Sequence, residues 1–263
     1  MTNIKASVII ANHNNSRFIN DCIKSLKEQT YKNIEIIFFD DCSNDNSIEE
    51  VKKFSGINLI TNTKNGKFGS FNQMNAYKQA FKKSIGEIIF FLDSDDYFCA
   101  DKIEKVINKF VLDEKLKVVF DLPIYKYEDK IIKNFYKKKK YLKNYWPFIF
   151  PQSCISIRRD FIDEIFEETN FELFPDTWMD FRISVYTTYI MNNFFILQEN
   201  LTYYRQSNFN VSSNFKFLGR SWWQRRLEAH EYIKFFFEKN GIKYTKNLDH
   251  FITVFVNKFI KIK

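Results

Sequence analysis

Apolar and polar positions follow two distinct patterns along the first 120 residues. Short, continuously apolar runs such as 7–10 are typical of strands that are buried on both faces of a sheet. Between these runs, apolar residues recur every three or four positions, which predicts amphipathic helices. Strands are expected at 7–10, 34–39, 57–60, 87–92 and 117–120, and helices at 18–26, 48–51, 71–81 and 103–110. Because strands and helices alternate, we predict an α/β protein with a mainly parallel sheet and helices on both of its faces.

The pattern is weaker after about residue 121. Residues 123–146 are rich in Lys and Tyr and are expected to form an insertion or a flexible basic loop. A return to the sheet is expected at 151–157, helices at 159–166 and 177–192, the end of a short strand at 203–205, a polar loop at 206–214, and helical structure from about 221 to 263.

Composition and charge narrow the class of protein. The chain has 263 residues, of which 45% are hydrophobic and 27% charged, which excludes a disordered protein and suits one α/β domain with an appended lobe. The formal net charge of +8 is compatible with a solvated Lys-rich surface, an anionic ligand, an anionic membrane surface or nucleic acid. Nucleic acid is disfavoured because the basic residues are dispersed and no recognised motif is present.

The spacing of the cysteines and the lengths of the apolar runs indicate the cellular compartment of the protein. The four cysteines lie far apart without metal-ligand spacing, which suits a reducing compartment. No apolar run reaches the length of a membrane span, and no secretory signal is recognised at Met1. The protein is therefore expected in the cytoplasm, either soluble or peripheral on the inner face of the membrane.

Three polar clusters follow predicted strands, at 11–15, 40–45 and 93–96. In parallel sheets, ligands bind at the carboxyl ends of the strands. Asp93, Asp95 and Asp96 would repel one another unless a cation or hydroxyl groups share the site. A hard divalent cation accepts one or two carboxylates together with phosphate oxygens, so the cluster fits a metal-diphosphate site. The alternative is a turn that caps the following helix.

The other two candidate segments are less specific. Asp41 can accept a hydrogen bond from a nucleobase N–H, although one residue of the Asp40–Asp41 pair is expected to form an Asx-turn instead. Residues 66–69 combine two glycines with Lys67, which could contact a phosphate or a base, and Asn72 follows. The spacing is not that of a Walker loop.

Together these segments resemble the inverting family 2 glycosyltransferases, which have a GT-A fold. The family's opening strand is matched by residues 7–14, its "DDGSxD" segment by 40–45 with Cys42 in place of Gly, its "GKxxALN" segment by 66–72, and its "DxDD" segment by 93–96. The resemblance is specific over residues 6–111 and thin beyond them. It implies a Rossmann-like sheet that binds a nucleotide-sugar.

The resemblance also assigns roles in the donor half. Asp41 would recognise the base, Asp93 the ribose and Asp95 a divalent metal, Mn²⁺ or Mg²⁺, with Asp93 as a second metal ligand. Ala11 and His13 would line the base pocket. The remaining expected donor contacts are Asn14, Lys67, Asn72 and Ser94.

The acceptor half departs further from the family pattern. Counting back from Arg182 places Asp176 at the family's general base, with Pro175 where Glu is usual; Asp180, one helical turn later, is the competing candidate. The family's "YRxH" segment is matched at 204–207, with Ser207 in place of His, so the group that assists the leaving group stays open. The expected acceptor contacts are Ser153, Trp178 and Arg205.

The resemblance implies a single displacement that moves a sugar from a nucleotide-diphosphate donor, with UDP favoured, to a saccharide or lipid-linked saccharide in surface glycan synthesis. Residues 1–121 would form the nucleotide-sugar-binding half, 122–215 the acceptor-binding half of the same domain, and 216–263 a helical extension. A catalytically inactive saccharide-binding scaffold is an alternative, and a nucleic-acid-binding protein is a remote one.

The extension ends in an amphipathic basic pattern. Leu248, Phe251, Ile252, Phe255, Phe259 and Ile262 fall on one helical face, whereas Lys residues lie mostly elsewhere. This helix is expected either to pack on the core or to contact an anionic membrane.

Overall fold

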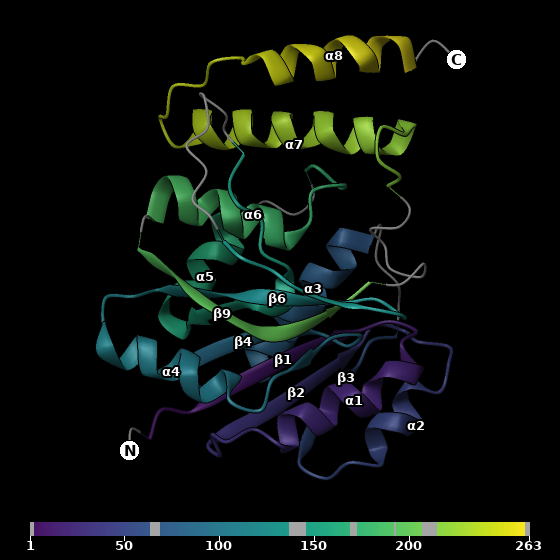
Figure 1. Ribbon diagram of the computed structural model, residues 1–263, viewed down its shortest axis with the longest axis vertical. Helices are drawn as coiled ribbons and strands as arrows, with labels where there is room; N and C mark the ends of the chain where they lie inside the picture. The colour runs from purple at the N-terminus through teal and green to yellow at the C-terminus, as the bar shows by residue number, and fades with distance from the viewer. Residues whose placement is uncertain are drawn as a thin grey trace.

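The computed structural model describes residues 3–63, 69–136, 146–168, 173–191, 193–206 and 215–260. Within them the chain forms a curled sheet with helices on both faces and a helical extension at one end, which confirms the predicted α/β class (Figure 1). The sheet has the strand order β3-β2-β1-β4-β8-β6-β9-β5, with β7 paired to β6.

The first four strands form a parallel block, as predicted. They are β1 (Ala6–Asn12), β2 (Ile34–Asp40), β3 (Ile57–Thr61) and β4 (Ile88–Asp93). The intervening helices are α1 (Ser16–Lys27), α2 (Ser47–Lys52) and α3 (Gly69–Lys83). All of these elements overlap the segments that the hydrophobic pattern predicts.

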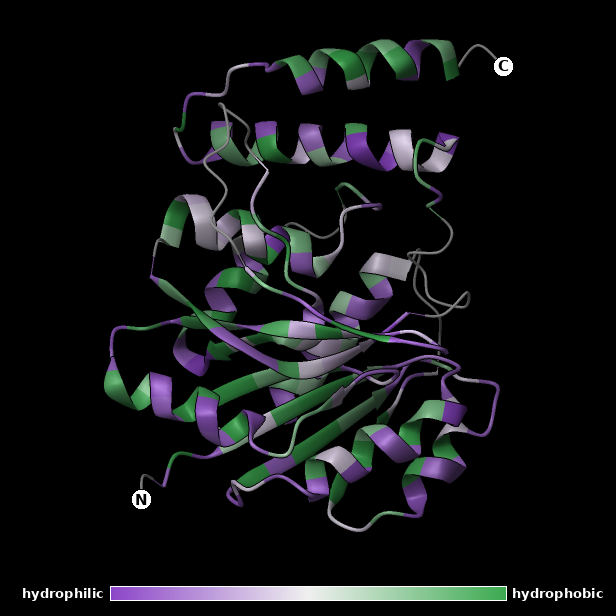
Figure 2. Ribbon diagram, in the orientation of Figure 1, coloured by the Kyte–Doolittle hydropathy of each residue, from purple (hydrophilic) through white to green (hydrophobic). Residues whose placement is uncertain are grey.

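Each face of the parallel block is buried in its own apolar cluster. Ile9 and Phe91 point to the face covered by α3, whereas Val8 and Phe90 point to the face covered by α1. Successive side chains of a strand point to opposite faces, so a strand that is covered on both sides must be apolar at every position. This arrangement explains the uninterrupted apolar runs in the sequence, which stand out in the centre of the molecule in Figure 2.

The second half makes the sheet mixed rather than mainly parallel. Its elements are β5 (Tyr97–Phe98), α4 (Lys102–Leu112), β6 (Val118–Lys126), β7 (Ile131–Lys133), η1 (Gln152–Cys154), β8 (Ile155–Arg158) and β9 (Phe194–Arg205). Among the described strands, β8 runs antiparallel to both β4 and β6, and β6 pairs with β9 in parallel.

Two expectations for this half are wrong. Residues 123–126 continue β6 and 131–133 form β7, so this part of the expected basic loop is a hairpin; residues 137–145 lie outside the described part. The strand that ends at Arg205 is not short but begins at Phe194. Both strands are half-exposed at their ends, where polar side chains mask the period-2 pattern.

The remaining helices are α5 (Arg159–Glu168), α6 (Met179–Tyr186) with a π-helical continuation (Thr187–Met191), α7 (Arg220–Lys239) and α8 (Leu248–Ile260). Of these, α5 and α6 pack in the same apolar cluster as the strands, and α7 and α8 lie outside them. One side of α7 packs on α6 through Tyr232 and Phe236, and α8 covers the other side (Figure 1). Among the helices that the structure describes, none is long and apolar enough to cross a membrane.

Candidate active site

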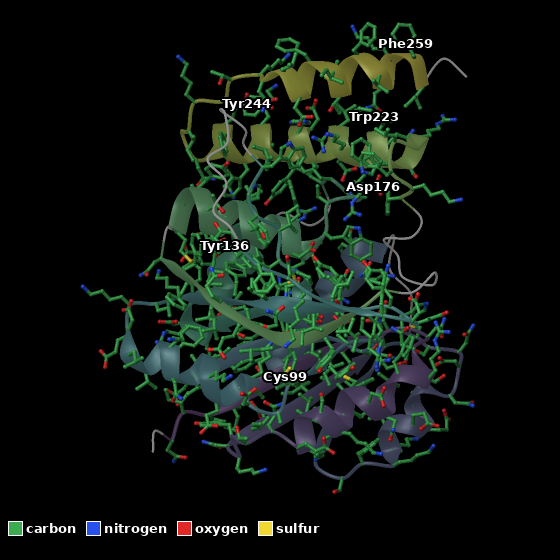
Figure 3. All side chains as sticks on the ribbon, viewed as in Figure 1. Cys99, Tyr136, Asp176, Trp223, Tyr244 and Phe259 are labelled. Carbon is green, nitrogen blue, oxygen red and sulfur yellow. The ribbon has the colours of Figure 1, made fainter. Side chains whose placement is uncertain are left out.

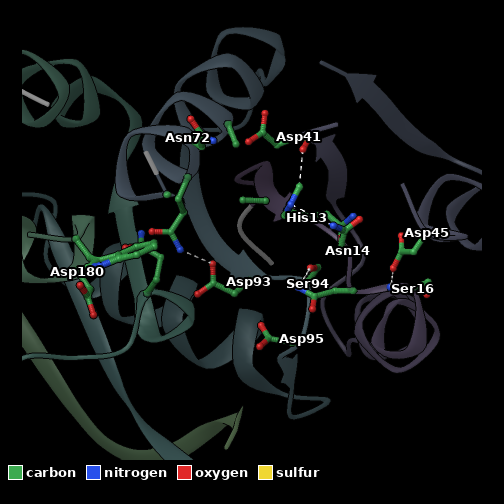
Figure 4. A pocket seen from close by; sticks show the side chains of 18 of the residues that line it. His13, Asn14, Ser16, Asp41, Asp45, Asn72, Asp93, Ser94, Asp95 and Asp180 are labelled. Carbon is green, nitrogen blue, oxygen red and sulfur yellow. Dashed lines mark hydrogen bonds between the residues drawn. The ribbon is translucent and has the colours of Figure 1, made fainter. Parts of the chain in front are cut away.

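A pocket of about 680 Å³ opens at the carboxyl ends of β1, β2 and β4. Its lining includes eight of the nine residues expected to bind a donor: Ala11, His13, Asn14, Asp41, Asn72, Asp93, Ser94 and Asp95. Lys67, the ninth, lies outside the described residues. Figure 4 shows Asp41 and Asp180 on opposite sides of this pocket, with Asp93 between them.

Strand register brings the donor-side groups together. Ala11 of β1 lies beside Asp93 of β4, and Asn12 of β1 lies beside Asp40 of β2. Polar groups that follow neighbouring parallel strands therefore meet at one edge of the sheet.

The two carboxylates at the end of β2 occupy different positions. Asp40 is buried, where its Oδ1 accepts from Asn12 Nδ2 (2.7 Å) and its Oδ2 accepts from the backbone N–H of Ser43 (3.0 Å), three residues on and not two as in the expected Asx-turn. Asp41 instead lines the pocket, and its Oδ1 accepts from Asn62 Nδ2 at 2.8 Å. Cys42 adopts a φ of 55°, a left-handed conformation that accounts for glycine at this position of the family motif.

His13 is placed by the same turn. Its Nδ1 lies 2.7 Å from the backbone oxygen of Asp41, so the ring is fixed at the rim of the pocket beside the Asp41 carboxylate. This position is compatible with stacking on a base.

In the 93–96 cluster, some residues line the pocket, and Asp96 lies beneath it and holds the end of β4. Asp93 Oδ1 accepts from Tyr77 Oη (2.7 Å) and Gln73 Nε2 (3.0 Å). Burial, followed by the charges of Asp95 and Asp180, raises the pKa of Asp93 to about 7. Burial also raises the pKa of Asp95. A ligand that brings positive charge would relieve this repulsion.

Asp96 is fully buried beneath the pocket and does not face a ligand. Its Oδ2 accepts from Ser153 Oγ (2.5 Å) and its Oδ1 accepts from the Arg205 backbone N–H (2.9 Å). Ser153 Oγ in turn accepts from the Asp93 backbone N–H at 3.0 Å. These bonds tie the end of β4 to the second half of the chain.

The residues at this edge fit a divalent cation only in part. In the portion of the chain that the structure describes, no group of three or more His, Cys, Asp or Glu side chains is arranged to hold a metal. Asp93 and Asp95 therefore offer one or two carboxylates, and substrate phosphates and water would have to supply the other ligands, as Mg²⁺ sites at phosphates commonly require.

The two candidates for the general base are separated in space. Asp180, in the first turn of α6, lines the pocket; burial raises its pKa, and the charge of Arg225 lowers it. Asp176 is not among the lining residues. It lies in the loop below α7 (Figure 3), where its backbone N–H donates to Glu228 Oε1 (2.5 Å) and its backbone oxygen accepts from Arg225 Nε (3.2 Å).

Of the expected acceptor contacts, Trp178 lines the pocket, whereas Ser153 and Arg205 do not. Ser153 is fully buried in the support network described above. Arg205 faces the opposite side of that network, where its guanidinium pairs with Asp21 (2.5 Å) and stacks over the ring of Phe18. The structure therefore gives both residues supporting positions and not pocket positions.

The sequence analysis did not predict several residues that line the pocket, notably Gln152, Tyr204, Arg225 and Arg17. Gln152 is 3% exposed, and neither polar atom of its amide has a hydrogen-bond partner within the described residues. An unpaired buried amide is costly, so this side chain is suited to a ligand that both donates and accepts, as sugar hydroxyls do. The sequence identified the correct segment, since Ser153 is adjacent, but no signal distinguished Arg225 within a long helix.

The comparisons with known proteins agree with this geometry. The family model described as "Glycosyl transferase family 2" matches residues 7 to 166. An uncharacterized glycosyltransferase of Nostoc is 30% identical over 220 residues, which cover 77% of this chain and 65% of the relative. The Escherichia coli UDP-Glc:alpha-D-GlcNAc-diphosphoundecaprenol beta-1,3-glucosyltransferase WfaP is 38% identical over 102 residues, 39% of each chain. The chain thus spans less than two thirds of either relative.

Solved structures share the fold at low sequence identity. TarS of S. aureus in complex with UDP-GlcNAc aligns with a TM-score of 0.62 and 18% identity, over 87% of this chain and 66% of that one. A mannosyltransferase from Pyrobaculum calidifontis in complex with GDP-Man and Mn²⁺ aligns with a TM-score of 0.57 and 14% identity, over 98% and 70%. Since the family model covers more than half of the sequence and the sheet, pocket and fold agree with it, the chain belongs to glycosyl transferase family 2.

Proposed function

We propose that the protein is a metal-dependent, inverting glycosyltransferase that moves a sugar from a UDP-sugar to a lipid-linked saccharide during the synthesis of a surface glycan. The observation that carries this proposal is the convergence of Asp41, Asp93, Asp95 and Asp180, from three separate segments of the chain, on one pocket. Relatives named for UDP-Glc donors and diphosphoundecaprenol-linked acceptors support the choice of substrates.

The donor lies across the ends of β1, β2 and β4. In the proposed complex Asp41 accepts from the base, His13 stacks on it, and Asp93 accepts from the ribose hydroxyls. Asp95, with Asp93, holds Mn²⁺ or Mg²⁺, which would neutralise charge on the diphosphate when bound. The unpaired amide of Gln152 binds sugar hydroxyls.

Asp180 is the proposed general base. It removes the proton from the acceptor hydroxyl, whose oxygen attacks the anomeric carbon while the bond to the diphosphate oxygen breaks. The nucleoside diphosphate leaves with the bonding electron pair, and the configuration at the anomeric carbon inverts. Burial favours this role because it raises the pKa of Asp180 and so makes the carboxylate a stronger base.

We propose further that the outer face of α8 rests on an anionic membrane. Leu248, Phe251, Ile252, Phe255 and Phe259 are between 46% and 75% exposed on this helix. Exposed Lys246 and Lys258 flank them, whereas the carboxylate Asp249 is turned inward and paired with Arg226. Figure 3 shows Phe259 on the side of α8 that faces away from α7. Large apolar side chains beside lysines suit a helix that lies in a membrane interface.

The donor proposal is tested by thermal denaturation with UDP and Mn²⁺. Binding at a concentration about 100 times Kd stabilises a protein by about 3 kcal/mol. We expect UDP with Mn²⁺ to raise the Tm, the increase to disappear in Asp95→Ala, and the control Glu114→Gln, an exposed carboxylate outside the pocket, to retain it. Failure of every common nucleoside diphosphate to raise the Tm would contradict the proposal.

The membrane proposal is tested by co-sedimentation with phosphatidylglycerol vesicles. We expect the wild type to sediment and the double variant Phe255→Gln/Phe259→Gln to remain in the supernatant. Equal sedimentation of both proteins, or dimerisation through the same face in size-exclusion chromatography, would reject it.

A further inference from the structure

We propose that Arg225 forms an anion subsite at the acceptor end of the pocket, and that the acceptor carries a phosphate group there. This proposal rests on the proposed glycosyl transfer. It assigns a negative charge to the acceptor, about which the residues at the donor end give no information.

Arg225 is held firmly and directed into the pocket. Its Nε donates to the Asp176 backbone oxygen at 3.2 Å, and its guanidinium carbon lies 4.6 Å from the centre of the Phe215 ring. One turn later on α7, Glu228 Oε1 accepts from the backbone N–H groups of Asp176 (2.5 Å) and Thr177 (2.9 Å). Helix α7 and the loop before α6 therefore form one unit, which places Arg225 among the residues that line the pocket with Trp178 and Asp180.

The pocket carries two guanidinium groups among its described lining residues, and they come from different ends of it. Arg17 lies in the first turn of α1, next to the Asn15–Ser94 hydrogen bond (3.0 Å), whereas Arg225 is bonded to the backbone oxygen of Asp176, four residues before Asp180. Arg17 therefore belongs to the end where the diphosphate and its cation are proposed to lie. Arg225 belongs to the end of the proposed base.

The stereochemistry of the reaction determines which substrate meets Arg225. In an in-line displacement, the base and the leaving group lie on opposite faces of the anomeric carbon. In Figure 4 Asp180 lies across the pocket from Asp41, whereas Asp95 lies close to Asp93. A cation beside Asp180 is consequently on the acceptor's side of the sugar and not on the side of the leaving diphosphate.

A phosphate on the acceptor would suit this position in two respects. A guanidinium binds phosphate through paired, charge-assisted hydrogen bonds, which are stronger than bonds to neutral hydroxyls. An anion bound to Arg225 would also offset the effect of Arg225 on Asp180 and leave that carboxylate more basic. A phosphate-linked acceptor would thus activate its own general base.

The test compares two acceptors that differ only in phosphate: GlcNAc-α-diphosphate with a short alkyl chain, and the matching neutral alkyl α-glycoside. Binding of each is measured by calorimetry in the presence of UDP and Mn²⁺, and transfer is measured separately. The variants are Arg225→Gln, Arg225→Lys and the control Arg220→Gln, which removes the same charge from the exposed start of the same helix.

We expect the wild type and Arg220→Gln to bind the diphosphate acceptor at least tenfold more tightly than the neutral one. Arg225→Gln should lose that preference and Arg225→Lys retain part of it, while binding of UDP stays unchanged in all of them. Equal weakening of both acceptors, or weaker UDP binding in Arg225→Gln, would overturn the inference, because Arg225 would then be structural or a donor contact. The binding ratio is independent of turnover, so absence of transfer would count against the proposed function alone.

Discussion

The proposed donor end and the proposed acceptor end of the pocket are positioned by different kinds of contact. At the donor end, Ala11, Asp41 and Asp93 lie at the carboxyl ends of three adjacent parallel strands, and the hydrogen-bond ladder of the sheet fixes their spacing. At the acceptor end, Trp178, Asp180 and Arg225 come from a loop and two helices that side-chain bonds to backbone hold together. The geometry of the donor end is therefore set within one sheet, whereas the geometry of the acceptor end depends on how α7 packs against α6 and the loop before it.

This difference has a consequence for mutation. A strand end is supported by many backbone hydrogen bonds, so single side-chain changes there should alter ligand binding and leave the geometry intact. The acceptor end depends on a few polar side chains of α7, so changes outside the pocket should alter it.

Replacement of the proposed base should have the largest effect. Asp180→Asn removes the group that accepts the acceptor's proton, and we expect kcat to fall by about 10³-fold. Asp176→Asn is the matched variant from the same segment, and we expect its kcat to stay within a few-fold of wild type because the bonds at Asp176 involve its backbone. Initial rates of UDP release with donor and acceptor measure both. The opposite ranking would return the assignment to Asp176.

The support beneath the donor end contains a fully buried ion pair. Lys102 Nζ lies 2.8 Å from Asp121 Oδ1 and donates to the backbone oxygen of Ser153 at 2.6 Å. Lys102→Met would leave the Asp121 carboxylate buried without its cation, and we expect the free energy of unfolding to fall by about 3 kcal/mol. Urea denaturation measures this change.

The control for that variant is Lys105→Met, one turn along the same helix, whose ion pairs with Asp101 and Glu199 are partly exposed. Surface pairs contribute less than about 1 kcal/mol. Equal losses in the two variants would show that burial of the Lys102 pair has no special importance.

Acid should weaken the α7–α8 layer through His230. Burial lowers the pKa of His230 to about 4, below its ordinary value of about 6.5, although Asp249 opposes the shift. The folded state therefore binds fewer protons than the unfolded state, and stability is lost as the pH falls from about 6.5 towards 4. Linkage limits the loss from this group to about 2 kcal/mol at pH 5. We expect the free energy of unfolding of His230→Gln, measured by urea denaturation, to depend less on pH than that of the wild type. An equal dependence in the two proteins would show that His230 is not the group responsible.

The smallest effect is expected at Glu228, a positioning residue that holds the loop of Asp176 and Thr177 from outside the pocket. Glu228→Ala should raise the KM for the acceptor about tenfold, a loss of about 1.4 kcal/mol, without changing the KM for the donor. Glu228→Gln keeps an amide oxygen that can accept the same bonds and should restore the acceptor KM. A parallel rise in both KM values would show that α7 supports the whole pocket.

Much of the donor end was predictable because its signals are local in sequence. The apolar runs predicted β1, β2 and β4, and the polar residues immediately after them supplied Asp41, Asp93 and Asp95. Sequence reasoning expected one carboxylate of the Asp40–Asp41 pair to form an Asx-turn; in the structure Asp40 accepts instead from the backbone N–H of Ser43, three residues on.

Elsewhere the sequence indicated segments but not the orientation of their side chains. Ser153 was expected at the acceptor, yet its neighbour Gln152 lines the pocket while Ser153 is buried with Asp96. Asp176 and Asp180 could not be separated by counting from Arg182, because that count assumes where the helix begins. In the structure α6 begins at Met179, after a loop that Glu228 of α7 holds.

The sequence by itself determined the α/β class and which strand ends carry the carboxylates of the pocket, because hydrophobic periodicity and strand-end polarity are encoded within a few consecutive residues. Only the tertiary structure decided that Arg225, more than forty residues after Asp180, lines the other end of the pocket and that Glu228 holds the neighbouring loop from outside it. The packing of α7 on α6 arises from contacts between segments distant in the chain, and the sequence carries no local pattern that specifies which side of a long helix will face a substrate.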